Sequence, residues 1–148
     1  MNTHQTLQPV EILLVEDNPG DQRLTKEAFK GGKIINTLSI VEDGIEALDY
    51  LYQRGKYSKV TRPDLIILDL NLPRLSGKQV LETIKTDENL RRIPVIILTI
   101  SQAEEDIIKS YDLHANCYVT KPLDIDQFNK VVQSIEEFWF AIVKLPTE

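Results

Sequence analysis

The sequence has little of what would place it in several common classes of protein. Among its 148 residues Cys117 is the single cysteine, so an internal disulfide is impossible and no cysteine and histidine cluster offers a zinc site. The longest apolar run, at 138–143, is six residues, far short of the ~20 that span a bilayer. Residues 1–9 have no hydrophobic stretch of the signal-peptide kind. These absences predict a reduced, cytoplasmic protein without a membrane partner.

Positive charge is outnumbered by negative charge. Lys and Arg number 17 against 23 Asp and Glu, a formal net charge of −6, which argues against direct binding to nucleic-acid phosphates. The content of 42% hydrophobic and 27% charged residues is typical of a globular domain with a sizeable core. Without a repeat or a linker, we predict one domain at 10–144, between a flexible N-terminal tail, 1–9, and a C-terminal tail, 145–148.

Short apolar runs alternate with segments of helical period, the pattern of βα units around a parallel sheet. Strands are predicted at 11–15, 34–41, 65–68, 94–98 and 117–119, and the more polar second one is expected at an edge. Helices are predicted at about 20–29, 45–52, 76–85, 102–113 and 124–143, with a turn-like connection at 53–63. The fold class is therefore α/β: a doubly wound parallel sheet of five strands with helices on both faces.

Two of the predicted helices begin with the spacing of a capping box. Ser76 stands three residues before Gln79, and Ser101 stands three residues before Glu104. In a capping box the hydroxyl accepts a hydrogen bond from the third residue on, whose side chain reaches back to the N-cap backbone. Both pairs are expected to stabilise a helix start in this way.

Residues with useful chemistry follow four of the five predicted strands. Glu16 and Asp17 follow the first strand, Asp69 the third, Thr99 the fourth, and Lys121 comes just after the fifth. Parallel strands end at one edge of a sheet, so these groups should converge. Carboxylates gathered there repel one another unless a cation lies among them, and hard oxygen ligands suit Mg²⁺. Beside such an ion a carboxylate can attack phosphorus, and a lysine can offset the phosphoryl charge.

Four stretches together resemble the receiver domain of two-component response regulators. They are LLVED at 13–17, LDLNLP at 68–73 with Gly77, ILT at 97–99 and YVTKP at 118–122, in the family's order and spacing. The resemblance implies a flavodoxin-like sheet of strand order 2-1-3-4-5. It also implies a signalling protein rather than an enzyme, one that receives its phosphoryl group from a sensor histidine kinase.

The resemblance also implies a role for each matching acidic position. Asp69 matches the phosphoacceptor and, with Asp17, a direct ligand of the Mg²⁺ cofactor. Glu16 matches the second acid, which reaches the metal through water. Asn71 matches the position whose backbone carbonyl ligates the metal.

Three further positions match the switch of the family. Thr99 matches the hydroxyl that moves toward the phosphoryl group, Lys121 its ion-pair partner, and Tyr118 the aromatic residue that turns inward on activation. The bond between Lys121 and Pro122 is expected to be cis, as is common in the family. The residue after the switch threonine is usually small, so Ile100 is a departure. Its larger side chain is expected to narrow access to the phosphoryl group, so that phosphorylation is slower or the phosphorylated state lasts longer.

The C-terminal half carries a narrower resemblance. The stretches SYDLHANCY at 110–118, IEEFW at 135–139 and LP at 145–146 are similar to the small response regulators paired with bacterial phytochrome histidine kinases. Those regulators are single receiver domains and often dimers. The implied partner is a phytochrome-type kinase, and the implied output is another protein, a change of dimerisation or onward phosphotransfer.

The last predicted helix has more apolar residues than a single core-facing stripe needs. The stripe comprises Phe128, Val131, Ile135, Phe138 and Ile142. Outside it lie Val132, Trp139, Phe140 and Val143. Leftover apolar surface of this kind is typical of an interface. We predict a homodimer through this helix, with Phe138, Trp139 and Phe140 at the interface; the alternative is that the C-terminal tail covers them.

Two other functions remain open at this point. A receiver that works as a constitutive docking module would not need the complete set of acidic, threonine and lysine residues. A phosphatase of the haloacid-dehalogenase type also uses an aspartate at a strand end, but it needs a second aspartate two residues later, where Asn71 stands. The sequence therefore favours a phosphorylated regulator.

Overall fold

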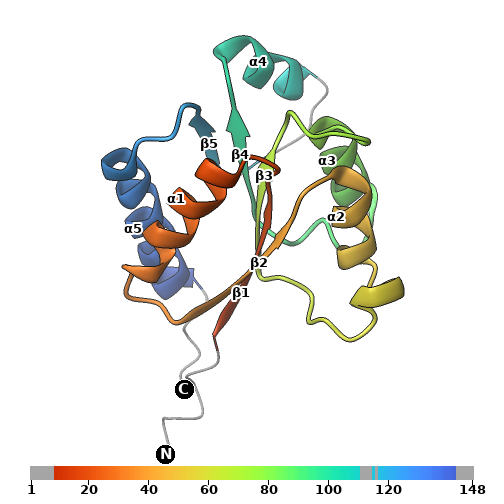
Figure 1. The fold of residues 1–148 in the computed structure, drawn as a ribbon, viewed down its shortest axis with the longest axis horizontal. Coiled ribbons are helices and arrows are strands. Elements are labelled where there is room, and N and C mark those ends of the chain that lie inside the picture. The colour runs from red at the N-terminus through yellow and green to blue at the C-terminus, as the bar shows by residue number, and fades with distance from the viewer. Residues whose placement is uncertain (1–8, 111–114, 116, 143–148) are drawn as a thin grey trace, which may run out of the picture.

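The chain forms a five-stranded parallel sheet between two layers of helices (Figure 1). The computed structural model describes residues 9–110, 115 and 117–142, with the backbone only of residues 110 and 138–142. The strands are β1 Val10–Val15, β2 Asn36–Val41, β3 Leu65–Asp69, β4 Val95–Thr99 and β5 Cys117–Thr120. Their order, β2-β1-β3-β4-β5, confirms the predicted topology and places β2 at an edge.

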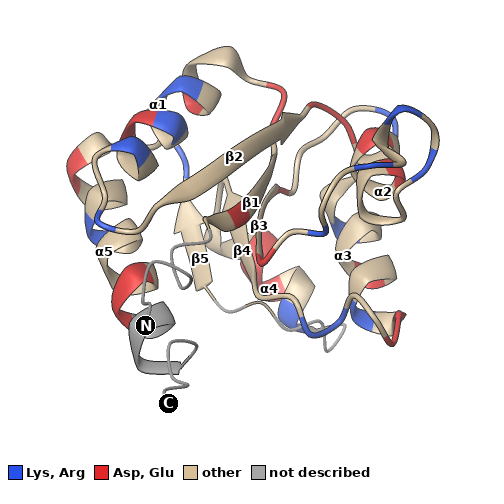
Figure 2. Ribbon diagram, turned by 90° about the horizontal axis from the view of Figure 1, so that it is seen from below, with Lys and Arg blue, Asp and Glu red and all other residues tan. Residues whose placement is uncertain are grey.

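The helices cover both faces of the sheet, as predicted. They are α1 Pro19–Lys30, α2 Gly44–Leu51, α3 Gly77–Thr86, α4 Gln102–Ser110 and α5 Ile125–Ile142, and the 3₁₀ helix η2 Gly55–Tyr57 lies in the connection after α2. Figures 1 and 2 show α1 and α5 on one side of the sheet and α2 and α3 on the other. The last residues predicted for α4, 111–113, lie outside the described residues.

Both faces of the central strands are buried, which explains their continuous apolar runs. Successive side chains of a strand point to opposite faces. Leu13, Leu68 and Ile97 belong to a cluster that also includes Leu81 and Ile84 of α3. A second cluster, under α1 and α5, contains Leu14, Ile67, Leu98, Phe29 and Phe128.

The interpretation of α5 needs one correction. Val132, predicted to lie outside the core-facing stripe, is only 2% exposed and packs in the cluster with Phe128. Val131 and Ile135 are half-buried at the margin of that cluster. Positions three and four residues apart lie on the same side of a helix, so the periodicity alone did not decide which row faces the sheet. The side chains of the predicted interface residues Phe138, Trp139 and Phe140 lie outside the described residues.

The start of α3 lies unusually close to the end of β3. The N–H of Gly77 donates to the carbonyl of Leu70 at 3.0 Å. A Cβ atom at Gly77 would lie 2.3 Å from the carbonyl oxygen of Asp69, so only glycine permits this approach. The helix begins with the predicted capping box of Ser76 and Gln79. Together these features hold the loop after Asp69 against the sheet edge.

Candidate functional site

The carboxyl ends of β1 and β3 bring three acidic side chains together. Glu16 follows β1 directly and is fully buried, and Asp69, the last residue of β3, is 2% exposed. Within the described residues, carboxylate oxygens of Glu16, Asp17 and Asp69 all lie within 4.8 Å of one another, with Asp17 at the surface. The parallel sheet thus produces the acidic cluster that the sequence pattern predicts.

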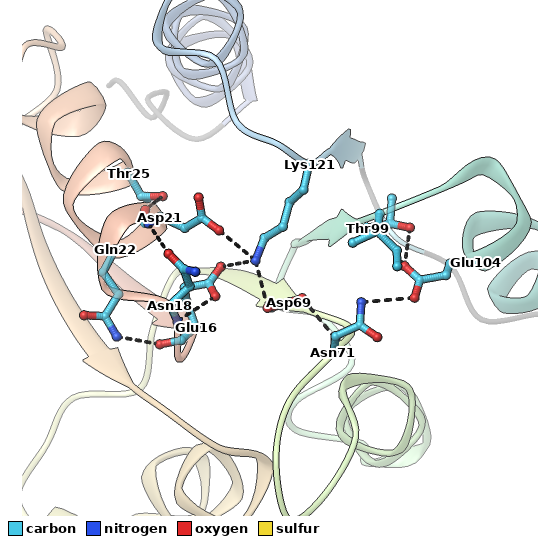
Figure 3. A network of polar contacts seen from close by, with 11 residues as sticks. Glu16, Asn18, Asp21, Gln22, Thr25, Asp69, Asn71, Thr99, Glu104 and Lys121 are labelled. Carbon is cyan, nitrogen blue, oxygen red and sulfur yellow. Dashed lines mark hydrogen bonds and ion pairs between the residues drawn. The ribbon is translucent and has the colours of Figure 1, made fainter.

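Lys121 connects these acids from the loop after β5 (Figure 3). Its Nζ lies 2.9 Å from Oε1 of Glu16 and 3.0 Å from Oδ2 of Asp69. A third carboxylate, Asp21, also lies 2.9 Å from this ammonium. Burial alone would lower the pKa of Lys121, but the hydrogen bonds that its ammonium donates to Glu16, Asp21 and Asp69 hold the pKa above its usual value. The lysine is therefore charged and fixed beside Asp69.

Asp21 is a residue of the site that the sequence pattern did not predict. It stands in the first turn of α1, where the side chain of Asn18 caps the helix by accepting from the Asp21 N–H at 2.9 Å. Asn18 followed by Pro19 is a recognisable helix start. That signal could have placed Asp21 beside Glu16 at the same edge of the sheet.

The environment of Glu16 is suited to a cation. Burial raises the pKa of Glu16 to about 7, against the opposing hydrogen bonds from Lys121 and the Asn18 N–H. Among the residues that the structure describes, Oε1 of Glu16 receives no well-formed hydrogen bond and has only the Lys121 ion pair. Several carboxylates share one ammonium here, and hard oxygen donors are the ligands that divalent cations such as Mg²⁺ prefer. The residues present fit such an ion.

Each carboxylate oxygen of Asp69 has one donor. The N–H of Asn71 donates to Oδ1 at 2.9 Å, and Lys121 donates to Oδ2 at 3.0 Å. The two donors fix the orientation of this buried carboxylate. Asn71 thus adjoins Asp69 through its backbone, at the position where its carbonyl is predicted to ligate a metal.

Of the three switch residues, Lys121 belongs to this cluster, whereas the hydroxyl of Thr99 has a partner outside it. The hydroxyl of Thr99 lies 2.7 Å from Oε1 of Glu104 and points away from Asp69 (Figure 3). The backbone N–H of Lys121 donates to the carbonyl of Thr99 at 2.7 Å, and the bond between Lys121 and Pro122 is cis, as predicted. Tyr118 is half-buried on β5, with the Lys109 ammonium 5.3 Å from the centre of its ring.

Glu104 corrects the second predicted capping box. Its N–H does lie 3.3 Å from the hydroxyl of Ser101. Its carboxylate does not reach back to the Ser101 backbone but accepts from Thr99, from the Ile100 N–H at 2.8 Å and from the Asn71 amide at 3.0 Å. Asn71 comes from a loop 33 residues away, so no local spacing could have revealed this choice of partner.

No helix in the described part of the chain is both long and apolar enough to cross a membrane.

This fold and cluster of side chains define a phosphorelay-type receiver, and the comparison of sequences agrees: residues 12–133 match the response regulator receiver domain, so the chain belongs to that family. Members of the family are signalling proteins rather than enzymes; they bind divalent metal and act with sensor histidine kinases. The family resemblance stated from the sequence is confirmed.

Individual relatives are similar over nearly their whole length. Response regulator Rcp1 of Synechocystis sp. is 49% identical over 138 residues, which cover 93% of this chain and 94% of Rcp1. The crystal structure of the phosphorylated cyanobacterial phytochrome response regulator RcpA is 48% identical, with a TM-score of 0.81 over 95% of this chain and 100% of that one. The Mn²⁺-bound form of Rcp1 has a TM-score of 0.79 and 48% identity over 94% of this chain and 100% of that one.

Proposed function

We propose that this chain is a single-domain response regulator that accepts a phosphoryl group from a histidine kinase on Asp69. The observation that carries the proposal is the setting of Asp69: a buried carboxylate at a strand end, 3.0 Å from the Lys121 ammonium and beside the carboxylates of Glu16 and Asp17. The similarity to RcpA, described as a phosphorylated phytochrome response regulator, supports both the modification and a kinase of the phytochrome type.

The cofactor in this proposal is Mg²⁺. Asp17, Asp69 and the backbone carbonyl of Asn71 would hold it directly, and Glu16 would hold it through water. The poorly satisfied Oε1 of Glu16 and the oxygen-only donor set support this assignment, as does the existence of a Mn²⁺-bound form of Rcp1. When bound, such an ion offsets negative charge on the phosphoryl oxygens.

The remaining chemistry belongs to side chains and one backbone N–H of this protein. A carboxylate oxygen of Asp69 forms the new bond to phosphorus as the bond to the donor breaks. The Asn71 N–H, 2.9 Å from Oδ1, orients the carboxylate. Lys121, anchored by Glu16 and Asp21, presents a fixed positive charge to the developing phosphoryl group, which needs little reorganisation during transfer.

The signal then leaves through a changed surface. Thr99 and Lys121 reorganise toward the new charge, Tyr118 follows, and binding of a partner or dimerisation changes. The dimer would use the C-terminal half of α5 with Phe138, Trp139 and Phe140. A monomer mass in solution that is independent of concentration, with and without phosphorylation, would contradict the dimer.

We also propose a cytoplasmic location, since Cys117 has no partner for an internal disulfide.

The test is incubation with acetyl phosphate and Mg²⁺, followed by intact mass spectrometry. We expect one phosphoryl adduct in the wild type, and none in Asp69→Asn or in the presence of EDTA. Asp64→Asn is the matched control, because Asp64 is an exposed aspartate just before the same strand. An undiminished adduct in Asp69→Asn contradicts the proposal. A wild type without an adduct does so as well, and favours the constitutive docking module.

The same mixture distinguishes the phosphatase alternative. Multiple turnovers of acetyl phosphate without an accumulating adduct would favour it over a regulator. Phosphotransfer from a purified phytochrome-type kinase, compared with a kinase of another sensory class, tests the narrower assignment. Equal transfer from both kinases would contradict the phytochrome-type partner.

A further inference from the structure

The carboxylate of Glu104 connects the two loops that border Asp69. Its Oε1 accepts from the Thr99 hydroxyl at 2.7 Å and from the Ile100 N–H at 2.8 Å. Its Oε2 accepts from the side-chain amide of Asn71 at 3.0 Å. Figure 3 shows these contacts side by side, with donors from the ends of β3 and β4 and the acceptor from α4. One side chain therefore couples the position of α4 to both loops.

These contacts are charge-assisted. Burial tends to raise the pKa of Glu104, but the donors from Ile100, Thr99 and Asn71 hold the pKa below its usual value. Glu104 is therefore ionised at neutral pH. Hydrogen bonds to an ionised acceptor are roughly twice as strong as neutral ones. Thr99 is 1% exposed, and besides Glu104 its hydroxyl has the carbonyl of Ser101, at 3.0 Å, as an acceptor.

The hydroxyl of Thr99 has one proton to donate. While that proton is directed to Glu104, it is not available to a phosphoryl oxygen on Asp69. We propose that Glu104 is a latch that holds Thr99 in the resting position, and that phosphorylation of Asp69 opens this latch. The inference rests on the proposed function of Asp69. It makes Glu104 a positioning residue, which acts through Thr99 and not on phosphorus.

The same arrangement suggests how the signal reaches α4. A phosphoryl group on Asp69 adds negative charge, which repels the Glu104 carboxylate while it attracts the Thr99 hydroxyl. Both effects break the contact between Thr99 and Glu104. Because Glu104 lies in the first turn of α4, its release frees the start of that helix. Opening of the latch is thus the event that joins the chemistry at Asp69 to the surface of α4.

Coupling of this kind is reciprocal. If phosphorylation opens the latch, then weakening the latch must favour binding of a phosphoryl group or its analogue. Glu104→Gln removes the charge but keeps the shape, and Glu104→Ala removes the acceptor. We expect each variant to bind beryllofluoride, a phosphoryl analogue, about tenfold more tightly in the presence of Mg²⁺, the size expected for one charge-assisted hydrogen bond.

The matched control is Asp106→Asn. Asp106 lies on the same helix, is exposed, and accepts from Gln102 at 3.1 Å, so its replacement removes an equal charge without touching Thr99. Calorimetric titration with beryllofluoride should show tighter binding for both Glu104 variants and wild-type affinity for Asp106→Asn. In a Thr99→Val background, Glu104→Gln should have a clearly smaller effect, because the latched hydroxyl is gone and only the charge repulsion remains.

Two outcomes of this titration overturn the latch alone. Wild-type affinity in Glu104→Gln is one, and an equal gain in Asp106→Asn, which would indicate a general charge effect, is the other. A second measurement does not depend on phosphoryl chemistry: the three-bond couplings that report χ1 of Thr99 in the unmodified protein. They should change in Glu104→Ala and not in Asp106→Asn, and unchanged couplings would overturn the latch. A wild type that binds no beryllofluoride and forms no adduct on Asp69 would overturn the proposed function together with the latch.

Discussion

The ammonium of Lys121 lies 2.9 Å from Oε1 of Glu16, a carboxylate oxygen in a fully buried side chain. The same ammonium is shared with Asp21 and Asp69. One positive charge therefore holds together carboxylates that would otherwise repel one another. A divalent cation placed among the same carboxylates would also offset their repulsion. Lys121 and the metal are therefore expected to stabilise the folded protein in the same way, so that each partly replaces the other.

Replacement of this lysine tests that relationship. Lys121→Met keeps the apolar stem but removes the charge, so we expect a lower melting temperature for the metal-free protein, since a buried charge loses its partner. Added Mg²⁺ should recover much of that loss, giving a larger metal-induced increase in melting temperature than in the wild type. Lys130→Met, at an exposed position of α5, serves as the control. An equal Mg²⁺ effect in wild type and Lys121→Met would contradict this account.

The close approach of Gly77 to the backbone of Asp69 predicts that a larger residue at position 77 destabilises the fold. Gly77→Ala would place a methyl group 2.3 Å from the Asp69 carbonyl oxygen and 2.6 Å from Cα of Leu70. Backbone must move to accept it, so we expect a loss of about 1–3 kcal/mol in the free energy of unfolding, as for other overpacked sites. In Gly31→Ala the nearest atom is 3.7 Å away, and a change below about 0.5 kcal/mol is expected. Urea denaturation of both variants provides the comparison.

Glu136 and Glu137 form a matched pair on α5. The buried carboxylate of Glu136 accepts from the Ile34 N–H at 2.9 Å, a contact across 102 residues. Glu136→Ala leaves that N–H without its acceptor, which should cost about 1–3 kcal/mol of unfolding free energy. Glu137 is exposed, so Glu137→Ala should be close to neutral. Similar denaturation midpoints for the two variants would argue against this contact.

Acid stability should depend in part on Tyr57. Its hydroxyl donates to Oε2 of Glu46 at 2.6 Å, and this hydrogen bond is the main reason that the pKa of Glu46 lies below its usual value of 4.5. An acid with a lowered pKa stabilises the folded state above its unfolded pKa, and that contribution is lost as the pH falls toward the folded value. Tyr57→Phe should therefore be less stable than wild type near neutral pH, and the difference should shrink on acidification below about 4.5. Melting curves at several pH values would show whether the difference narrows.

Ile100 offers a test of access to the phosphorylation site. Its side chain is 58% exposed, and it directly follows Thr99. We expect Ile100→Ala to be phosphorylated faster by acetyl phosphate, or to lose its phosphoryl group sooner, because a smaller side chain leaves Asp69 more accessible. The rates are measured by intact mass over time. Unchanged rates of phosphorylation and dephosphorylation would contradict a role of Ile100 in limiting access to Asp69.

The elements of the fold were accessible from the sequence because their causes are local or depend on burial alone. Strands β3 and β4, buried on both faces, appear as continuous apolar runs, and the capping box of Ser76 and Gln79 is a short-range pattern. The prediction that Val132 lies outside the core-facing stripe of α5 was wrong for an equally simple reason. A helix with apolar residues three and four apart has two rows that can face a sheet, and only packing against α1 and the strands selects one.

The sequence by itself determined that Glu16, Asp17, Asp69, Thr99 and Lys121 would stand at one edge of a parallel sheet, because the alternation of strands and helices orients every strand the same way. Only the tertiary structure decided which partner each polar side chain takes. Lys121 is shared with Asp21, and Thr99 is bound to Glu104 rather than directed to Asp69. Such choices depend on the distance between loops from separate βα units, and a hydrogen bond or ion pair forms only when folding brings donor and acceptor within about 3 Å.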